Sequence, residues 1–162
     1  MKRLKSWSWF RSWKMNLRRG DAESYCAALE AAGAGSLGPQ VVLFPPFPLL
    51  SVVAAGLGDT GVEWGGQDLH AEREGAHTGD VSGLHLLDWD SRWVLCGHSE
   101  RRQDHEESDE LVASKIRAAI DVGLEPLHGV VDTLITIPNH RLLALAGKQT
   151  GIQDAFKLAD DV

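Results

Sequence analysis

Long apolar runs are missing from the sequence. The longest candidate, Val41–Leu50, is interrupted by three of the chain's six prolines, whereas a membrane-spanning helix needs about 20 consecutive apolar residues. No apolar stretch of about 7–15 residues follows the basic N-terminus, so we expect no secretory signal. These absences predict a protein with no membrane partner.

Cysteine is also scarce, because Cys26 and Cys96 are the only two in 162 residues. Two cysteines do not make a disulfide framework, and neither belongs to a C-x-x-C motif. Each has apolar neighbours, which indicates reduced thiols in the core of a cytoplasmic protein. The seven histidines show no H-E-x-x-H spacing, and we therefore expect no structural metal.

Acidic residues are absent from the first 19 positions, which hold seven basic residues. The other 143 residues carry 23 acidic and 9 basic side chains, so the net charge of the chain is −7. An acidic body disfavours nucleic acid as a partner. A hydrophobic share of 43% at this length predicts a folded domain with a core rather than a disordered chain.

Short apolar runs alternate with helical patterns along the chain. Strands are predicted at Val41–Phe44, Val62–Gly66, Trp93–Gly97 and Leu127–Ile137. Helices are predicted at Asp21–Ala32, Leu49–Leu57, Arg141–Ala146 and Ile152–Val162, and a short helix or turn at Leu84–Trp89. Asp21 is expected to cap the first of them. A further helix is predicted from Ser108 to Gly123, with an apolar stripe of Val112, Ile116, Ala119 and Ile120.

This alternation predicts an α/β fold with a parallel sheet, in which about four βα units precede residue 124. A complete (β/α)₈ barrel takes about 250 residues. The chain is therefore expected to form a partial (β/α)₈ (TIM) barrel or an open doubly wound sheet. In both folds, functional groups gather at the C-terminal ends of the strands, where Lys14, Gln67 and the segment His98–Arg102 are found.

The segment His98-Ser99-Glu100-Arg101-Arg102 follows the predicted strand Trp93–Gly97 directly. Backbone N–H groups at the start of a helical turn disfavour an imidazolium, so His98 is expected to stay neutral and to donate a hydrogen bond to a developing oxyanion. Glu100 adds a carboxylate, and Arg101 is placed to pair with other carboxylates. The alternative is a polar loop whose charges are simply solvated.

Two further motifs carry weaker signals. Lys14 can hold an anionic substrate by its charge, or it is one more base in a basic N-terminal segment. The small residues of Gly75–Asp80 indicate a loop tip, which either inserts into a partner or is a surface loop.

Taken in order, six short motifs resemble the triose-phosphate isomerase family. They are Trp13-Lys14-Met15-Asn16, Phe44-Pro45-Pro46, Gly66-Gln67-Asp68-Leu69, Gly75-Ala76-His77-Thr78-Gly79-Asp80, Gly97-His98-Ser99-Glu100-Arg101-Arg102, and Ser108-Asp109-Glu110-Leu111-Val112 leading to Lys115. The resemblance covers about residues 12–127. It implies about four βα units of the TIM barrel, a fifth strand and C-terminal helices.

The resemblance also implies roles for individual residues. Lys14 would bind the substrate and stabilise charge, His98 would be the neutral electrophile, and Glu100 would support Lys14 and the proton transfers. Thr78 would enter a neighbouring subunit of a homodimer and brace its active site. The substrates would be dihydroxyacetone phosphate and glyceraldehyde 3-phosphate, with no cofactor.

The sequence departs from the family pattern at its start. Ser12 stands where the family has an asparagine that binds substrate, and its shorter side chain is not expected to reach the substrate or to hold Lys14. Upstream, Lys5–Arg11 carries tryptophans and charges that fit the central strand of a barrel badly.

The family's catalytic base lies on a Tyr-Glu-Pro-Val-Trp-like segment that this sequence lacks. The only Glu-Pro, Glu125-Pro126, falls at the start of the predicted fifth strand. The closing lid and the glycine-rich phosphate loops are also missing. We therefore expect the isolated chain to be inactive as an isomerase.

Downstream of residue 128 a second resemblance replaces the first. Asp132–Leu143 and Thr150–Val162 resemble the FtsZ family of bacterial tubulin-like cell-division GTPases, without the glycine-rich phosphate loop of that family. The simplest interpretation is a truncated isomerase segment, 1–127, fused near residues 128–131 to a GTPase-like segment, 128–162. A recombined gene, a sequence-assembly join and a deliberate chimera are all open.

Two functions follow as expectations. The first is a member of the triose-phosphate isomerase family that takes part in glycolysis and gluconeogenesis but is inactive alone. The alternative is a non-enzymatic fusion or interaction fragment, whose exposed sheet edges would promote self-association.

Overall fold

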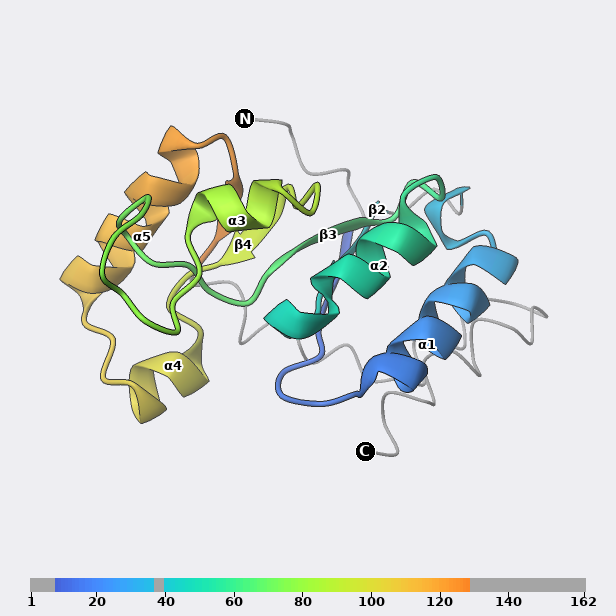
Figure 1. Cartoon of the computed structure of the whole chain (residues 1–162), viewed down its shortest axis with the longest axis horizontal. Coiled ribbons are helices and arrows are strands. Elements are labelled where there is room, and N and C mark those ends of the chain that lie inside the picture. The colour runs from blue at the N-terminus through green and yellow to red at the C-terminus, as the bar shows by residue number, and fades with distance from the viewer. Residues whose placement is uncertain (1–7, 37–39, 129–162) are drawn as a thin grey trace.

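A computed structural model describes residues 8–36 and 40–128 of the chain. Five parallel strands pair in chain order and curl into a half-barrel with helices outside it (Figure 1). The strands are β1 (Ser8–Ser12), β2 (Gln40–Phe44), β3 (Glu63–Gly66), β4 (Trp93–Leu95) and β5 (Glu125–Leu127). This is the partial TIM barrel predicted from the sequence.

Helices connect each strand to the next, as parallel pairing requires. The α-helices are α1 (Arg19–Ala31), α2 (Leu50–Leu57), α3 (Gly83–Leu87), α4 (Ser99–Asp104) and α5 (Asp109–Asp121), with two short 3₁₀ turns at Ala34–Ser36 and Phe47–Leu49. In Figure 1, α1 and α2 lie side by side over one part of the sheet, and α3 and α5 cover the other. No helix among the described residues is long and apolar enough to cross a membrane.

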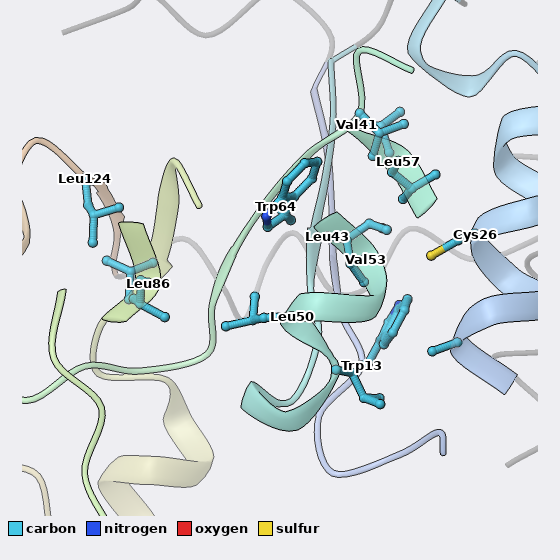
Figure 2. Close-up of a cluster of buried hydrophobic side chains, with 14 of the residues drawn as sticks. Trp13, Cys26, Val41, Leu43, Leu50, Val53, Leu57, Trp64, Leu86 and Leu124 are labelled. Carbon is cyan, nitrogen blue, oxygen red and sulfur yellow. The ribbon is translucent and has the colours of Figure 1, made fainter. Parts of the chain in front are cut away.

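Alternate residues of each central strand face two different cores. Val41 and Leu43 of β2 belong to the larger cluster between sheet and helices, and Figure 2 shows them beside Val53 and Leu57 of α2. Val42 and Phe44 point to the inner face of the half-barrel, where they join Trp93 and Leu95 of β4 in a second cluster. Strands buried on both faces explain why β2 and β4 read as continuous apolar runs.

The first strand corrects one expectation. Lys5–Arg11 was expected to fit a barrel strand badly, but Ser8–Ser12 pairs with Gln40–Phe44 in regular parallel register. The ring of Phe10 contacts the inner cluster, with its centroid 5.6 Å from that of Trp93 and 6.5 Å from that of Phe44. Aromatic packing on the inner face therefore accommodates an unusual strand sequence.

Several predicted boundaries shift by a few residues. Helix α1 begins at Arg19 rather than Asp21, because the Asp21 carboxylate accepts a hydrogen bond from the N–H of Arg18, the residue that caps the helix. Ile120 was expected in the buried stripe of α5 but is 59% exposed, whereas Lys115 is buried.

The fifth strand was predicted at Leu127–Ile137 and is observed at Glu125–Leu127. The rest of the predicted strand lies outside the described part of the chain, apart from His128. The same is true of the two predicted C-terminal helices, of the GTPase-like segment and of the second domain in the division at 127/128.

Candidate active site

His98 lies where β4 passes into α4, and the local backbone fixes its protonation pattern. It caps α4, and its Nδ1 accepts a hydrogen bond from the Glu100 N–H at 3.2 Å. A neutral imidazole that accepts at Nδ1 carries its proton on Nε2. The side chain is buried, and Nε2 has no hydrogen-bond partner among the described residues. In the neutral ring, Nε2–H is therefore the group available to donate a hydrogen bond.

Glycine is required just before His98. Gly97 has a φ of +68°, and a Cβ at this position would lie 2.7 Å from a methyl group of Val112 in α5. The chain can therefore turn sharply from β4 into α4 while α5 packs against the turn.

Lys14 follows strand β1, and its side chain reaches the same end of the sheet as His98. Its Nζ lies 2.6 Å from Oε1 of Glu100, and the other oxygen of Glu100 lies 3.6 Å from Nδ1 of His98. The structure thus brings together the three residues that the sequence predicted as catalytic, from segments more than 80 positions apart. The Lys14–Glu100 pair is partly exposed, so it contributes less to stability than to the placement of the ammonium group.

The backbone of Lys14 is held in a left-handed conformation, with a φ of +52°. Such a conformation is costly for a residue with a Cβ and persists only where neighbours enforce it. The Ser12 hydroxyl accepts a hydrogen bond from the backbone N–H of Lys14 at 3.2 Å and so supports this turn. That Ser12 is too short to reach the substrate or to hold the Lys14 side chain stays a prediction.

Gln67 is the residue whose role sequence reasoning missed. Its Nε2 donates to the carbonyls of Lys14 and of Phe44, both at 2.8 Å, and so ties the Lys14 turn to the ends of β2 and β3. The sequence marked Gln67 only as a polar residue at a strand end. Its two acceptors are 53 and 23 positions away, a pairing that no local pattern reveals.

A buried cluster of charged side chains lies between α4 and α5. Lys115 of α5, only 5% exposed, donates to both oxygens of Asp68 at 2.7 and 2.8 Å and to Glu107 at 2.6 Å. Arg101 of α4 contacts the same two carboxylates, at 2.9 Å for Asp68 and 2.6 Å for Glu107. The predicted pairing of Arg101 with nearby carboxylates is confirmed. The cluster links the segment after β3 to α5 and to α4, the helix that His98 caps.

The pKa values of the two carboxylates in this cluster are shifted in opposite directions. Burial raises the pKa of Asp68, and the hydrogen bond and charge of Lys115, with the charge of Arg101, offset only part of that rise. Burial also acts to raise the pKa of Glu107, but hydrogen bonds from Lys115 and Arg101 outweigh it and hold that pKa below its usual range.

Thr78 lies apart from the other predicted site residues. It is exposed in the loop between β3 and α3, as a loop tip predicts, and no hydrogen bond among the described residues joins it to Lys14 or His98. A role in bracing a neighbouring subunit stays a prediction. The predicted buried thiols are confirmed, since Cys26 and Cys96 are both free and buried.

Comparisons with known proteins point to one family. A family model described as triosephosphate isomerase matches residues 10–157. The chain is 46% identical over 122 residues to triosephosphate isomerase of Acidithiobacillus ferrooxidans, covering 75% of this chain and 48% of that protein. The corresponding enzyme of Symbiobacterium thermophilum is 42% identical over 123 residues, 76% of this chain and 48% of its own length.

Solved structures give the same result. Triosephosphate isomerase from Bartonella henselae matches with a TM-score of 0.70 and 29% sequence identity, over 88% of this chain and 62% of that one. The chain spans about half the length of the curated relatives it matches. The family match continues through residue 157, and the comparisons give no support to a GTPase-like segment after residue 128.

Proposed function

The chain belongs to the triosephosphate isomerase family, and from that premise we propose that it supplies the electrophilic part of a triose-phosphate isomerase active site. The reaction would interconvert dihydroxyacetone phosphate and glyceraldehyde 3-phosphate, as glycolysis and gluconeogenesis require. The proposal rests mainly on one observation: the buried Nε2 of His98, which has no hydrogen-bond partner in residues 8–36 and 40–128, lies near the Lys14–Glu100 pair.

The interconversion moves a proton between two neighbouring carbons. A base removes a proton from the carbon next to the carbonyl, and negative charge then develops on the carbonyl oxygen. The Nε2–H of His98 would donate a hydrogen bond to that oxygen and pass a proton between the two substrate oxygens. The ammonium group of Lys14, oriented by Glu100, would attract the anionic substrate and stabilise the developing charge.

The 162 residues contain no glutamate in a segment like that of the family's base, and no glycine-rich phosphate loop. We therefore propose that this chain by itself does not turn over substrate. A separate or additional stretch of polypeptide would have to supply the base and the phosphate site, since without a base the proton on carbon has no acceptor.

A chimera tests whether the site residues are functional. Residues 10–127 of this chain would be followed by the part of the Acidithiobacillus ferrooxidans enzyme that lies beyond the match. We expect the chimera to isomerise triose phosphate, and His98→Gln to lower its kcat at least about 100-fold, since general acid–base groups contribute about 10²–10⁴-fold. His105→Gln, in an exposed position at the end of the same helix, is the matched control.

Two results would contradict the proposal. One is a chimera that is folded by circular dichroism but has no isomerase activity. The other is an active chimera in which His98→Gln and His105→Gln have the same effect.

Self-association is part of the proposal. Met15, next to Lys14, is 96% exposed, and the loop Gly75–Asp80 is exposed along its whole length. An apolar side chain beside the site and a protruding loop are the features expected of two copies that dock loop against site. Light scattering from the purified chain tests this, and a monodisperse monomer at high concentration would argue against it.

The remaining parts of the sequence interpretation stand as hypotheses. We propose a cytoplasmic location, in keeping with a glycolytic family and two buried free thiols, and a division into residues 1–127 and 128–162. The alternative of a non-enzymatic interaction fragment, and the GTPase-like origin of residues 130–162, depend on parts of the chain that the structure does not describe. DNA reads that run unbroken across the codons for residues 125–135 would support a single gene.

A further inference from the structure

The segment between β3 and α3 contains a loop that its own backbone closes. The His70 N–H donates to the Val81 carbonyl at 2.8 Å, so the two ends of residues 70–81 lie together. Within the loop, the Asp80 N–H donates to the His77 carbonyl at 3.0 Å. This turn keeps Asp80 next to His77, and Gly79, with a φ of +94°, provides the backbone conformation.

Three side chains with metal-binding atoms meet in this loop. The rings of His70 and His77 stack with centroids 3.9 Å apart and planes inclined by 29°. His70 Nε2 lies 3.7 Å from Oδ2 of Asp80. One ligand atom from each of the three residues lies within 4.8 Å of the others. The residues form the spacing H-x₆-H-x₂-D, which fits no common zinc motif and gave no signal in the sequence.

We propose that His70, His77 and Asp80 form a site for a single divalent transition-metal ion, with Zn²⁺ as the best fit and water completing its shell. Two imidazoles and one carboxylate are a donor set that zinc binds, and nitrogen donors select such ions over Mg²⁺ and Ca²⁺. The site shares no residue with Lys14, His98 and Glu100, so it does not depend on the proposed isomerase function.

Binding requires the stack of His70 and His77 to open and the ligand atoms to draw together, because a metal ion lies in the plane of each imidazole that binds it and two stacked rings cannot share one ion. Zinc takes imidazole nitrogen at about 2.0–2.1 Å and carboxylate oxygen at about 2.0–2.2 Å, so tetrahedral ligand atoms lie about 3.3 Å apart. The three atoms must therefore approach by about 1.5 Å at most. His77 and Asp80 are exposed and His70 is only partly buried, so rotation of their side chains can achieve this.

A hydrogen bond at His70 supplies a specific reporter of binding. The Glu72 N–H donates to His70 Nδ1 at 3.0 Å, so the neutral ring carries its proton on Nε2. Zinc at Nε2 would displace that proton, and the ring would then carry a proton on Nδ1. Zinc at Nδ1 would replace the Glu72 N–H directly. Either way the Glu72 amide loses its acceptor.

Bound zinc would also act on the loop as a whole. It would join His70, at the start of the loop, to His77 and Asp80, which lie on either side of Thr78, and so hold Thr78 in one position. Thr78 is the residue expected to contact a neighbouring subunit. The ion would therefore serve as a clamp on a docking loop rather than as a reactive centre.

The test uses the full 162-residue chain, titrated with zinc alone in a buffer free of chelators. Calorimetry should give one site per chain, and the NMR signal of the Glu72 amide should shift with the same binding curve. His77→Phe keeps an aromatic ring for the stack but removes a ligand. Loss of a group that only orients a ligand costs about 10–100-fold in affinity, so His77→Phe and Asp80→Asn should each cost at least about tenfold.

His105→Phe is the matched control, because it exchanges an exposed histidine outside the loop. It should leave the affinity unchanged. The proposal is overturned if the wild-type chain leaves the Glu72 amide unmoved at millimolar zinc. It is equally overturned if His77→Phe and Asp80→Asn bind zinc as tightly as the wild type does.

Discussion

Single residues with unusual backbone angles hold His98 in place, and Gly97 shows this most clearly. Its φ is +68°, and an added Cβ would lie 2.7 Å from Val112 and 3.2 Å from Nε of Arg102. A left-handed conformation costs a residue with a Cβ about 1–2 kcal/mol, and overpacking adds about 1–3 kcal/mol. Gly97→Ala should therefore lower the free energy of unfolding by about 2 kcal/mol or more, measured by urea denaturation.

Gly123, just beyond α5, is the control for that substitution. Its φ is +88°, but nothing lies within 4 Å of the position that a Cβ would take. Gly123→Ala should therefore cost only the backbone strain of about 1–2 kcal/mol. Equal losses for the two variants would show that packing of α5 against Gly97 does not matter.

The two thiols give a second prediction for single residues. Burial raises the pKa of Cys26 to about 11 and that of Cys96 to about 12, where nearby carboxylates add to the effect of burial. Since the thiolate is the reactive form, both should resist a disulfide reagent at pH 8 in the native chain and react at once in denaturant. Rapid reaction of either thiol without denaturant would contradict the buried positions.

The sequence predicted which candidate side chains meet better than it predicted the contacts that support them. Lys14, His98 and Glu100 follow strand ends within recognisable motifs, so their proximity could be anticipated. The contacts of Gln67 with two distant carbonyls, and of Lys115 with Asp68 across 47 positions, depend on how the elements pack. Long-range pairs of this kind leave no periodic signal in a single sequence.

At the scale of elements, α5 is the best-defined helix in sequence terms. Ser108 caps it, and its side chain accepts a hydrogen bond from the Leu111 N–H at 3.2 Å. Ser108→Ala should cost about 1 kcal/mol, the usual value for loss of an N-cap side chain. Ser114→Ala, at a half-buried position in the same helix where the hydroxyl donates to the Leu111 carbonyl, should change stability by about 0.5 kcal/mol or less, because the higher helix propensity of alanine offsets the lost bond. Similar losses for both would argue against the cap.

The charge cluster between α4 and α5 predicts how stability responds to acid. The pKa of Glu107 is lowered from 4.5, so its ionised form contributes stability above about pH 4.5, and this is lost as the pH falls through the folded value. The contribution of Asp68 to stability depends on pH in the opposite sense, because the pKa of Asp68 is raised from 3.8. Its preference for the protonated state contributes stability below about pH 3.8 that is lost as the pH rises through the folded value.

Glu107→Gln tests that balance. The variant should lose stability at neutral pH and lose less on acidification below about pH 4.5 than the wild type does. Urea denaturation at a series of pH values between about 3 and 6 measures both effects. Parallel stability curves for the two proteins would mean that Glu107 does not titrate below its ordinary range in the folded state.

Elements differed in how well they could be predicted. Strands β2 and β4 are buried on both faces, so each is an uninterrupted apolar run. Strand β1 contains serine and arginine and was expected to fit badly, yet it pairs regularly with β2. Ile120 matched the helical period of α5 but lies on its exposed side. Periodicity identifies a helix well and the limits of its buried face poorly.

At the scale of the molecule, five parallel strands and their helices form half of a barrel and bring Lys14, Glu100 and His98 together at one end of the sheet. A parallel sheet with functional groups at the C-terminal ends of its strands was predicted from the sequence, because alternating strands and helices permit few arrangements. The sequence left a partial barrel and an open doubly wound sheet as alternatives, and the observed strand order is that of the partial barrel. The chain matches its relatives over about half of their length. Its proposed chemistry is correspondingly the chemistry of Lys14, His98 and Glu100 alone.

The isomerase rate of the purified 162-residue chain tests this account most directly. A coupled assay with glyceraldehyde 3-phosphate should give a rate no higher than that of buffer, and the same rate for His98→Gln, because the sequence contains no segment like the one that carries the family's base. Turnover above background that disappears in His98→Gln would contradict the account. It would show that this chain holds a complete isomerase site.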